Sequence, residues 1–390
     1  MQLFLGGGSV EGSWWRDQSD LDDEQVKFID LPQDGRYLLI GPPGSGKTNL
    51  LLLRAKYYYG QGLKNILVIT FTKDLANFIR TGIGAKGYLP PEVVMTYHSW
   101  AARHVRDHLG PGSMGSGKEF SVESRDLLVD LVAKATEASV TKKMYDMILV
   151  DEAQDLSKEE LTLLLALSDR VALAGDRKQG IYEQDGLTAL TSLGLKTVAL
   201  KYHYRIGPEI CKVADKIIPP ENADELLEKY CNYKEVDYGS SATLDTYANL
   251  DAQYGELLDS VVNQLKAYPN DSIGIITPKN ELIVELRNRF STSVLANDIA
   301  YHDLDSEDHA FTSGKRIHVL TAHSAKGTEF RAVHIFATEK FKFPLHHREL
   351  LYTAVTRAKT SLSAYRTGSV LGYIETAFAK PQHTKIADLF

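Results

Sequence analysis

The stretch that decides the fold is Gly41-Pro42-Pro43-Gly44-Ser45-Gly46-Lys47-Thr48. It fits the pattern Gly-x-x-x-x-Gly-Lys-Ser/Thr, and it lies between an apolar run at residues 37–40 and a helical stretch. Glycines allow backbone N–H groups to converge on phosphate oxygens, and the start of a helix adds positive potential. We therefore predict a nucleotide-binding loop. Its expected contacts are Gly41, Gly44, Ser45 and Gly46 with phosphate, Lys47 with the β- and γ-phosphates, and Thr48 with Mg²⁺.

Two acidic residues, Asp151 and Glu152, directly follow a second apolar run at residues 147–150. Ligands of open α/β sheets bind at the carboxyl ends of the strands. Two acids after a strand are usually a solvated turn, but a phosphate loop in the same chain favours catalysis. We expect Asp151 to hold Mg²⁺ and Glu152 to activate the attacking water.

Short apolar runs alternate with helical stretches along the chain, which is typical of α/β folds with parallel sheets. The pattern occurs in both halves and predicts two α/β units. Buried strands are expected at residues 37–40, 65–70, 147–150, 171–174, 272–276, 317–320 and 333–336.

Composition shifts suggest domain boundaries. We expect an N-terminal domain at residues 1–200, a connector at 201–240 and a C-terminal domain at 241–390. The first domain contains a small insertion at about residues 101–140, with a Gly/Ser-rich exposed loop at 110–118 and a helix at 121–139.

The composition, with 43% hydrophobic and 24% charged residues, is that of an ordinary globular protein and excludes a disordered or collagen-like chain. The two cysteines, Cys211 and Cys231, lack CxxC spacing, so neither a zinc site nor a disulfide framework is expected. No apolar run approaches the ~18 residues of a membrane helix, and we expect a cytoplasmic protein. The net charge of −7 argues only mildly against nucleic acid, because a binding groove needs only local positive charge.

Four further motifs follow in order: Gly175-Asp176-Arg177-Lys178-Gln179-Gly180-Ile181-Tyr182, Tyr204-Arg205, residues 321–330 (TAHSAKGTEF) and residues 351–359 (LYTAVTRAK). Together with the phosphate loop and Asp151-Glu152-Ala153-Gln154-Asp155, they resemble the superfamily 1 DNA helicases of the UvrD/Rep/PcrA group, from about Leu21 to Lys359. This resemblance implies two tandem RecA-like motor domains with ATP bound in the cleft between them. The large inserted subdomains of that family are missing, so we expect a compact motor.

The resemblance also implies roles at the nucleotide. Gln25 would read the adenine edge, and Tyr204 would stack under the base. Gln179 would sense the γ-phosphate, which Arg205 and Arg357 would approach from the second domain. Gly327 and Glu329 would lie near the ribose and triphosphate.

Further residues match the family's DNA contacts. Aromatic stacking on bases is tolerant of sequence, which suits a motor. One departure weakens the expected grip: Gln184 and Asp185 stand where the family usually has a stacking Trp and an Arg. The matching residues are Thr70, Phe71, Tyr97, His98 and Tyr182, with Thr321 and His323 in the second domain.

The leading interpretation is an ATP-dependent translocase and helicase on single-stranded or tailed DNA, with 3′ to 5′ as the direction implied by resemblance. The alternative is a DNA-stimulated ATPase that acts as the sensor or regulatory subunit of a nuclease, in an antiphage or repair complex. A nucleotide kinase would leave the motifs after residue 170 unexplained. Polarity, the choice of DNA or RNA, the protein partner, the oligomeric state and the role of Trp14 and Trp15 stay open at this level.

Overall fold

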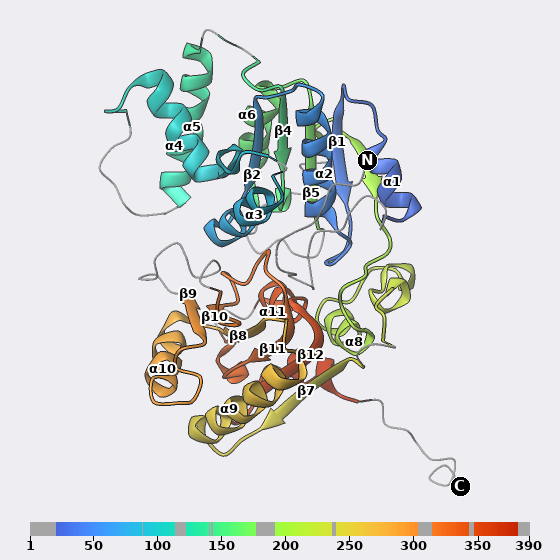
Figure 1. Ribbon diagram of the computed structural model, residues 1–390, viewed down its shortest axis with the longest axis vertical. Helices are drawn as coiled ribbons and strands as arrows, with labels where there is room; N and C mark the ends of the chain where they lie inside the picture. The colour runs from blue at the N-terminus through green and yellow to red at the C-terminus, as the bar shows by residue number, and fades with distance from the viewer. Residues whose placement is uncertain are drawn as a thin grey trace. The chain divides into compact units, whose positions relative to one another are not determined.

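The structure is a computed structural model that describes residues 21–380, apart from residues 88, 114–121, 140, 142, 177–191, 236–238, 303–313 and 343–346. The described chain forms two compact units, each built on a six-stranded sheet (Figure 1). The strand pairings recorded in both sheets are parallel. The predicted α/β fold with two parallel sheets is therefore confirmed.

The sheet of the first unit has the strand order β3-β2-β4-β5-β1-β6. Its inner strands β2, β4 and β5 are buried along their whole length, which is why each reads as a continuous apolar run. The strands are β1 (Arg36–Ile40), β2 (Ile66–Thr70), β3 (Val94–Thr96), β4 (Met147–Val150), β5 (Val171–Gly175) and β6 (Lys196–Ala199).

Helices cover both faces of this sheet, because successive strand residues point to opposite sides. Leu38 packs in a cluster with residues of α4 (Tyr97–Leu109), α5 (Val122–Ala138) and α6 (Lys158–Ala166). Its neighbour Leu39 packs in a second cluster on the other face. That cluster includes residues of α1 (Asp23–Ile29), α2 (Lys47–Gly60) and α3 (Lys73–Lys86).

The sheet of the second unit has the order β7-β12-β11-β8-β10-β9. Residues of α9 and α10 share an apolar cluster with its central strands. The strands are β7 (Ser241–Thr246), β8 (Ile273–Thr277), β9 (Ile299–His302), β10 (Ile317–Thr321), β11 (Phe330–Ile335) and β12 (Ala358–Arg366). The helices include α9 (Leu250–Ala267), α10 (Asn280–Phe290), α11 (Arg348–Val355) and α12 (Gly372–Phe378).

Residues 204–240 belong to the second unit. They contain the helix α8 (Pro208–Ile217), which packs against α11 and α12, and the short helical turns η4 (Ala223–Glu225) and η5 (Glu228–Tyr230). The Asp215 carboxylate accepts hydrogen bonds from the backbone N–H groups of Leu227 and Glu228, at 3.0 and 3.1 Å. A buried carboxylate thus ties the turn before η5 to helix α8.

The short helices at other positions are η2 (Pro91–Val93), η3 (Ala153–Asp155) and η7 (Thr338–Lys340). In the part of the chain that the structure describes, no helix combines the length and the apolar character that a membrane span requires.

Candidate functional site

The phosphate loop joins strand β1 to helix α2. Gly44 and Gly46 have φ angles of 77° and 87°, in the left-handed region that favours glycine. A Cβ atom at Gly46 would also lie 3.2 Å from Nε2 of Gln25. Gly46 is the N-cap of α2, so the helix begins at Lys47 and directs its first N–H groups toward the loop. Gly44 and Gly46 therefore adopt backbone conformations that suit a phosphate-binding loop, while the binding of nucleotide by this loop stays a prediction.

Lys47 and Ser45 both bond within the loop. The Lys47 ammonium donates hydrogen bonds to the carbonyl oxygens of Gly41 and Pro42, at 2.8 and 3.0 Å. The Ser45 hydroxyl donates to the same Pro42 oxygen at 2.8 Å. These contacts hold the positively charged Lys47 ammonium in the loop, as an anion-binding loop requires.

Thr48 and Asp151 meet at the end of β4. The Thr48 hydroxyl donates a hydrogen bond to Asp151 Oδ2 at 2.6 Å. Asp151 is buried, and burial, followed by the charge of Glu152, raises its pKa to about 7. Hydroxyl and carboxylate oxygens are the ligands that Mg²⁺ prefers, and a buried carboxyl group with a raised pKa is stabilised in its charged form by a cation. These residues therefore fit a Mg²⁺ ion.

Glu152 is held in an unusual backbone conformation beside Asp151. Its φ and ψ angles are 52° and 42°, which are strained for a residue other than glycine. The Gln154 amide donates to Glu152 Oε2, and its own oxygen accepts from the N–H of Asp176 at 3.1 Å. Gln154 thus connects the acid to the end of β5 and fixes its direction. Gln154 has no role among the predictions from sequence, although it lies in the motif of residues 151–155.

Gln25 supports the phosphate loop from α1. Its Nε2 donates to the carbonyl oxygen of Ser45 at 2.9 Å, and its Oε1 accepts from the backbone N–H of Asp22 at 3.1 Å. The side chain is buried. The contact of Gln25 with an adenine edge stays a prediction, but its hold on the loop is direct.

Residues 326–328 pack with the first unit. The Lys326 ammonium lies 2.6 Å from Asp155 Oδ1, and both side chains are buried. Gly327 has a φ angle of 80°, and a Cβ atom there would lie 2.7 Å from a methyl group of Leu75. The segment expected near the ribose and triphosphate is therefore anchored next to η3, which follows the acidic pair.

In the second unit, Glu329 lies between two cations. Its carboxylate oxygens lie 2.5 Å from the Arg205 guanidinium and 2.5 Å from the Lys359 ammonium. Burial alone would raise the pKa of Glu329, but the charges of Lys359 and Arg205 outweigh it and lower the pKa to about 2. Arg205 is thus held in place by a carboxylate that stays charged.

Arg357 lies two residues after the end of α11 and is buried. Its Nε donates to the carbonyl oxygen of Thr353 at 3.0 Å, and a terminal nitrogen donates to the Thr356 hydroxyl at 3.2 Å. Arg205 reaches the carbonyl oxygen of the same Thr356 at 3.4 Å. The structure therefore brings the two predicted arginines and Glu329 together within the second unit. Tyr204, which precedes Arg205 in the chain, is half-buried.

Among the predicted DNA contacts, Phe71 and His98 lie side by side. Their ring centroids are 6.2 Å apart in an edge-to-face arrangement, and the Arg125 guanidinium lies 6.0 Å from the Phe71 ring centroid. Both side chains are half-buried. A half-buried ring beside a cation is a suitable contact for a base.

Two predicted contacts need correction. The side chains of Thr70 and Tyr97 are 1% and 0% exposed, so neither is available to a nucleic acid. Thr70 ends the inner strand β2, and Tyr97 packs in the core beside Trp100. Both residues were assigned because their motifs resemble the family's DNA-contact motifs, and such a resemblance does not tell which side chains of a motif are buried.

The remaining residues can be placed only in part. Thr321 ends β10, and its hydroxyl accepts a hydrogen bond from the N–H of Ser324 at 3.2 Å, which closes the turn that carries His323. His323 itself is half-buried. Gln179 and Tyr182 lie outside the residues that the structure describes, as do Gln184, Asp185, Trp14 and Trp15.

Comparison with known proteins gives two family matches. Residues 27–185 match the model of an AAA domain, and residues 316–365 match the model of the UvrD-like helicase C-terminal domain. A probable DNA helicase II homolog from Rickettsia conorii is 34% identical over 119 residues, which are 29% of this chain and 18% of that protein. A probable DNA helicase from Mycoplasma pneumoniae is 27% identical over 240 residues, 55% of this chain and 42% of that protein.

The structure of arterivirus nonstructural protein 10, a helicase, aligns with 91% of this chain and 64% of its own, at 14% identity and a TM-score of 0.43. That likeness is too distant to add to the fold described above. The matched segments of the two bacterial relatives are less than half of their lengths. The family matches cover the phosphate loop, the acidic pair and Arg357. Together, the two family matches and the helicase names of the relatives support the resemblance of this chain to the UvrD-like superfamily 1 helicases.

Proposed function

We propose that this chain is an ATP-dependent DNA helicase or single-stranded DNA translocase, moving in the 3′ to 5′ direction. The observation that carries the proposal is the 2.6 Å contact of Thr48 with Asp151 beside a complete phosphate loop. The match of residues 316–365 to the C-terminal domain of UvrD-like helicases and the helicase names of the relatives support DNA as the track.

The residues of the first unit would perform hydrolysis as follows. The loop N–H groups and Lys47 bind the phosphates. Glu152, whose carboxylate is oriented by Gln154, accepts a proton from the attacking water. Thr48 and Asp151 would hold Mg²⁺, which neutralises phosphate charge when bound. Catalysis of phosphoryl transfer consists mostly of positioning and electrostatic stabilisation, and these side chains are already positioned.

Arg205 and Arg357 would supply positive charge to the γ-phosphate. Each is pre-positioned: Arg205 by Glu329, and Arg357 by the carbonyl oxygen of Thr353. Guanidinium groups that are held by protein contacts lose little freedom when they bind an anion. We propose that their engagement links the nucleotide state to movement on DNA.

The test is ATP hydrolysis by the purified chain with and without single-stranded DNA, alongside unwinding of 3′-tailed and 5′-tailed duplexes. Strong stimulation with unwinding of the 3′-tailed duplex alone is expected. Lys47→Ala should abolish hydrolysis, and Glu152→Gln should bind ATP without turning it over. Hydrolysis that is indifferent to DNA would refute the proposed motor.

Phe71→Ala tests the proposed DNA contact separately from the proposed ATP hydrolysis. Its basal ATP hydrolysis should be retained, while stimulation by single-stranded DNA should fall, because stacking on one base is worth ~1–3 kcal/mol. Tyr57→Ala is the matched control, because it removes an aromatic ring on α2 that is 52% exposed. Its stimulation by single-stranded DNA should be unchanged. Unchanged stimulation in Phe71→Ala would remove this residue from the DNA contacts.

A second candidate is a DNA-stimulated ATPase that serves as the sensor or regulatory subunit of a nuclease. One observation favours it: Gln184 and Asp185 replace an aromatic and a basic residue of the family pattern, which weakens the expected grip on DNA. Stimulation of ATP hydrolysis without unwinding of either duplex by the isolated chain would favour this candidate.

A further inference from the structure

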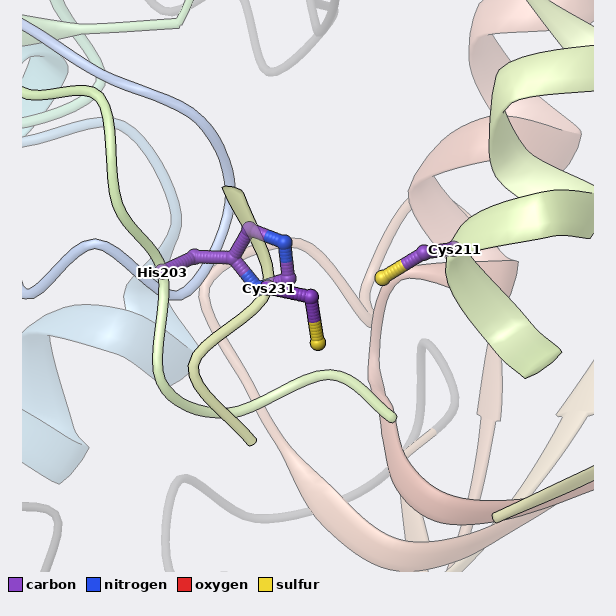
Figure 2. A group of neighbouring side chains, drawn as sticks. All are labelled: His203, Cys211 and Cys231. Atoms are coloured by element: carbon purple, nitrogen blue, oxygen red, sulfur yellow. The ribbon is translucent and has the colours of Figure 1, made fainter. Parts of the chain in front are cut away.

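The two cysteines of the chain come together although twenty positions separate them. Cys211 lies on helix α8, and Cys231 directly follows η5. Figure 2 shows Cys211 projecting from its helix toward the side chains of His203 and Cys231. One ligand atom from each of the three residues lies within 4.8 Å of the other two. No zinc site was expected from the spacing of the cysteines in the sequence, because folding rather than spacing brings these three residues together.

We propose that His203, Cys211 and Cys231 bind a thiophilic divalent cation, Zn²⁺. Two sulfurs and one imidazole nitrogen form a donor set that Zn²⁺ prefers over Mg²⁺ or Ca²⁺. Tetrahedral Zn²⁺ with Zn–S bonds of ~2.3 Å places two sulfurs about 3.8 Å apart, so side-chain rotation suffices to close the observed group. Three protein ligands leave the fourth position for water.

The backbone holds the two sulfurs toward one point. Both thiols donate to the carbonyl oxygen of Ile206, Cys231 at 3.1 Å and Cys211 at 3.5 Å. Ile206 is buried, and so are His203 and Cys211, whereas Cys231 is half-buried. The group is therefore shielded on most sides and reachable through Cys231, which gives an ion a route of entry.

The electrostatic surroundings favour a cation. The carboxylates of Asp215 and Glu228 create negative potential at the Cys211 sulfur, and those of Glu228 and Glu235 do so at the Cys231 sulfur. Binding of Zn²⁺ forms two Zn–S bonds and releases the thiol protons to solvent.

The position of the site gives the ion a structural effect. His203 directly precedes Tyr204 and Arg205 in the chain. A metal bridge from His203 to α8 and to the end of η5 would restrict the backbone that carries Arg205. This consequence rests on the proposed role of Arg205 in ATP hydrolysis, but metal binding itself does not.

The test uses the full chain, reduced with a phosphine and stripped with a chelator, then titrated with Cd²⁺ and with Zn²⁺. The chain contains two cysteines only, so a cadmium–thiolate charge-transfer band can arise from no other thiol. We expect one tightly bound ion per chain, a band of two-thiolate intensity, and a rise in melting temperature with Zn²⁺.

Variants assign the ligands. Cys231→Ser should halve the band and remove the thermal shift. Cys211→Ala, which replaces a buried thiol with a small apolar side chain, should have the same two effects. His203→Asn should keep the two-thiolate band but weaken binding by more than the roughly 10–100-fold that loss of an outer-shell partner costs. His347→Asn, which removes an exposed imidazole, should bind like the unmodified chain.

Circular dichroism identifies variants that fail to fold. The cadmium titration of the folded, unmodified chain then decides whether the site exists. Absence of a stoichiometric cadmium band in it overturns the site. Equal affinity in His203→Asn and His347→Asn removes the imidazole from the ligands and overturns the three-residue site. Failure of ATP hydrolysis with intact metal binding would contradict the proposed function alone.

Discussion

Asp151 combines two opposing requirements in one carboxyl group. Metal binding needs it charged, whereas its burial and the neighbouring Glu152 favour the neutral form and raise its pKa to about 7. The hydrogen bond from Thr48 offsets only part of this effect. The residue that we propose as a Mg²⁺ ligand therefore reduces the stability of the metal-free fold at neutral pH, as is common at functional sites.

The pH dependence of stability should reveal this cost. The pKa of Asp151 is higher in the folded chain than the 3.8 of the unfolded chain, so its contribution weakens as the pH rises from about 4 to about 7. Without Mg²⁺, the free energy of unfolding of the unmodified chain relative to Asp151→Asn should fall by about 2–3 kcal/mol between pH 5 and pH 8. Urea denaturation of both proteins measures it, and parallel pH profiles would contradict the assignment.

At the scale of elements, a charged side chain links helix α5 of the inserted stretch to its neighbours. Arg125 forms two hydrogen bonds with the Glu160 carboxylate of α6 and one with the carbonyl oxygen of Asp155, at 2.9 Å. Glu160 is fully buried and also caps the start of α6 through the N–H of Ser157. The pair thus joins α5, α6 and η3, and it holds a cation next to Phe71.

Removal of that cation should therefore destabilise the first unit. We expect Arg125→Met to lower the free energy of unfolding by about 3 kcal/mol, because it leaves a buried carboxylate uncompensated. Arg103→Met is the matched control, since the pair of Arg103 with Asp107 is exposed, and it should cost less than about 1 kcal/mol. Urea denaturation gives both values, and equal losses in the two variants would contradict this account.

The strands differ in how well the sequence predicts them. The inner strands β2 and β4 carry apolar side chains at every position because helices cover both faces, and their ranges were predicted to within one residue. Strands β3, β6, β7, β9 and β12 were not predicted. Of these, β6 and β7 are largely exposed edge strands with polar residues, such as Lys196 and Thr197 in β6, so their pairing is decided by the neighbouring strand rather than by their own composition. The inner strand β12 alternates buried and half-buried residues over much of its length and so lacks a continuous apolar run.

At the scale of the whole molecule, nucleotide binding should be linked to unfolding. A non-hydrolysable ATP analogue with Mg²⁺ at about 100 times its dissociation constant should stabilise the chain by about 2.7 kcal/mol. Lys47→Ala should lose most of this effect because the loop loses its fixed positive charge. Lys64→Ala, which removes an exposed lysine, should retain it. Thermal denaturation with and without the analogue measures the shift, and equal stabilisation of both variants would place the nucleotide elsewhere.

The sequence by itself determined the phosphate loop, the acidic pair and the parallel α/β architecture. Each of these depends on neighbouring residues: backbone groups within one turn, or an unbroken apolar run that only a doubly covered strand can bury. Only the tertiary structure decided the burial of Thr70 and Tyr97, the hydrogen bond between Gln154 and the backbone of Asp176, and the meeting of Cys211 with Cys231. These features arise where segments distant in the chain pack together, and no local pattern records which side chains the packing excludes from water or brings into contact.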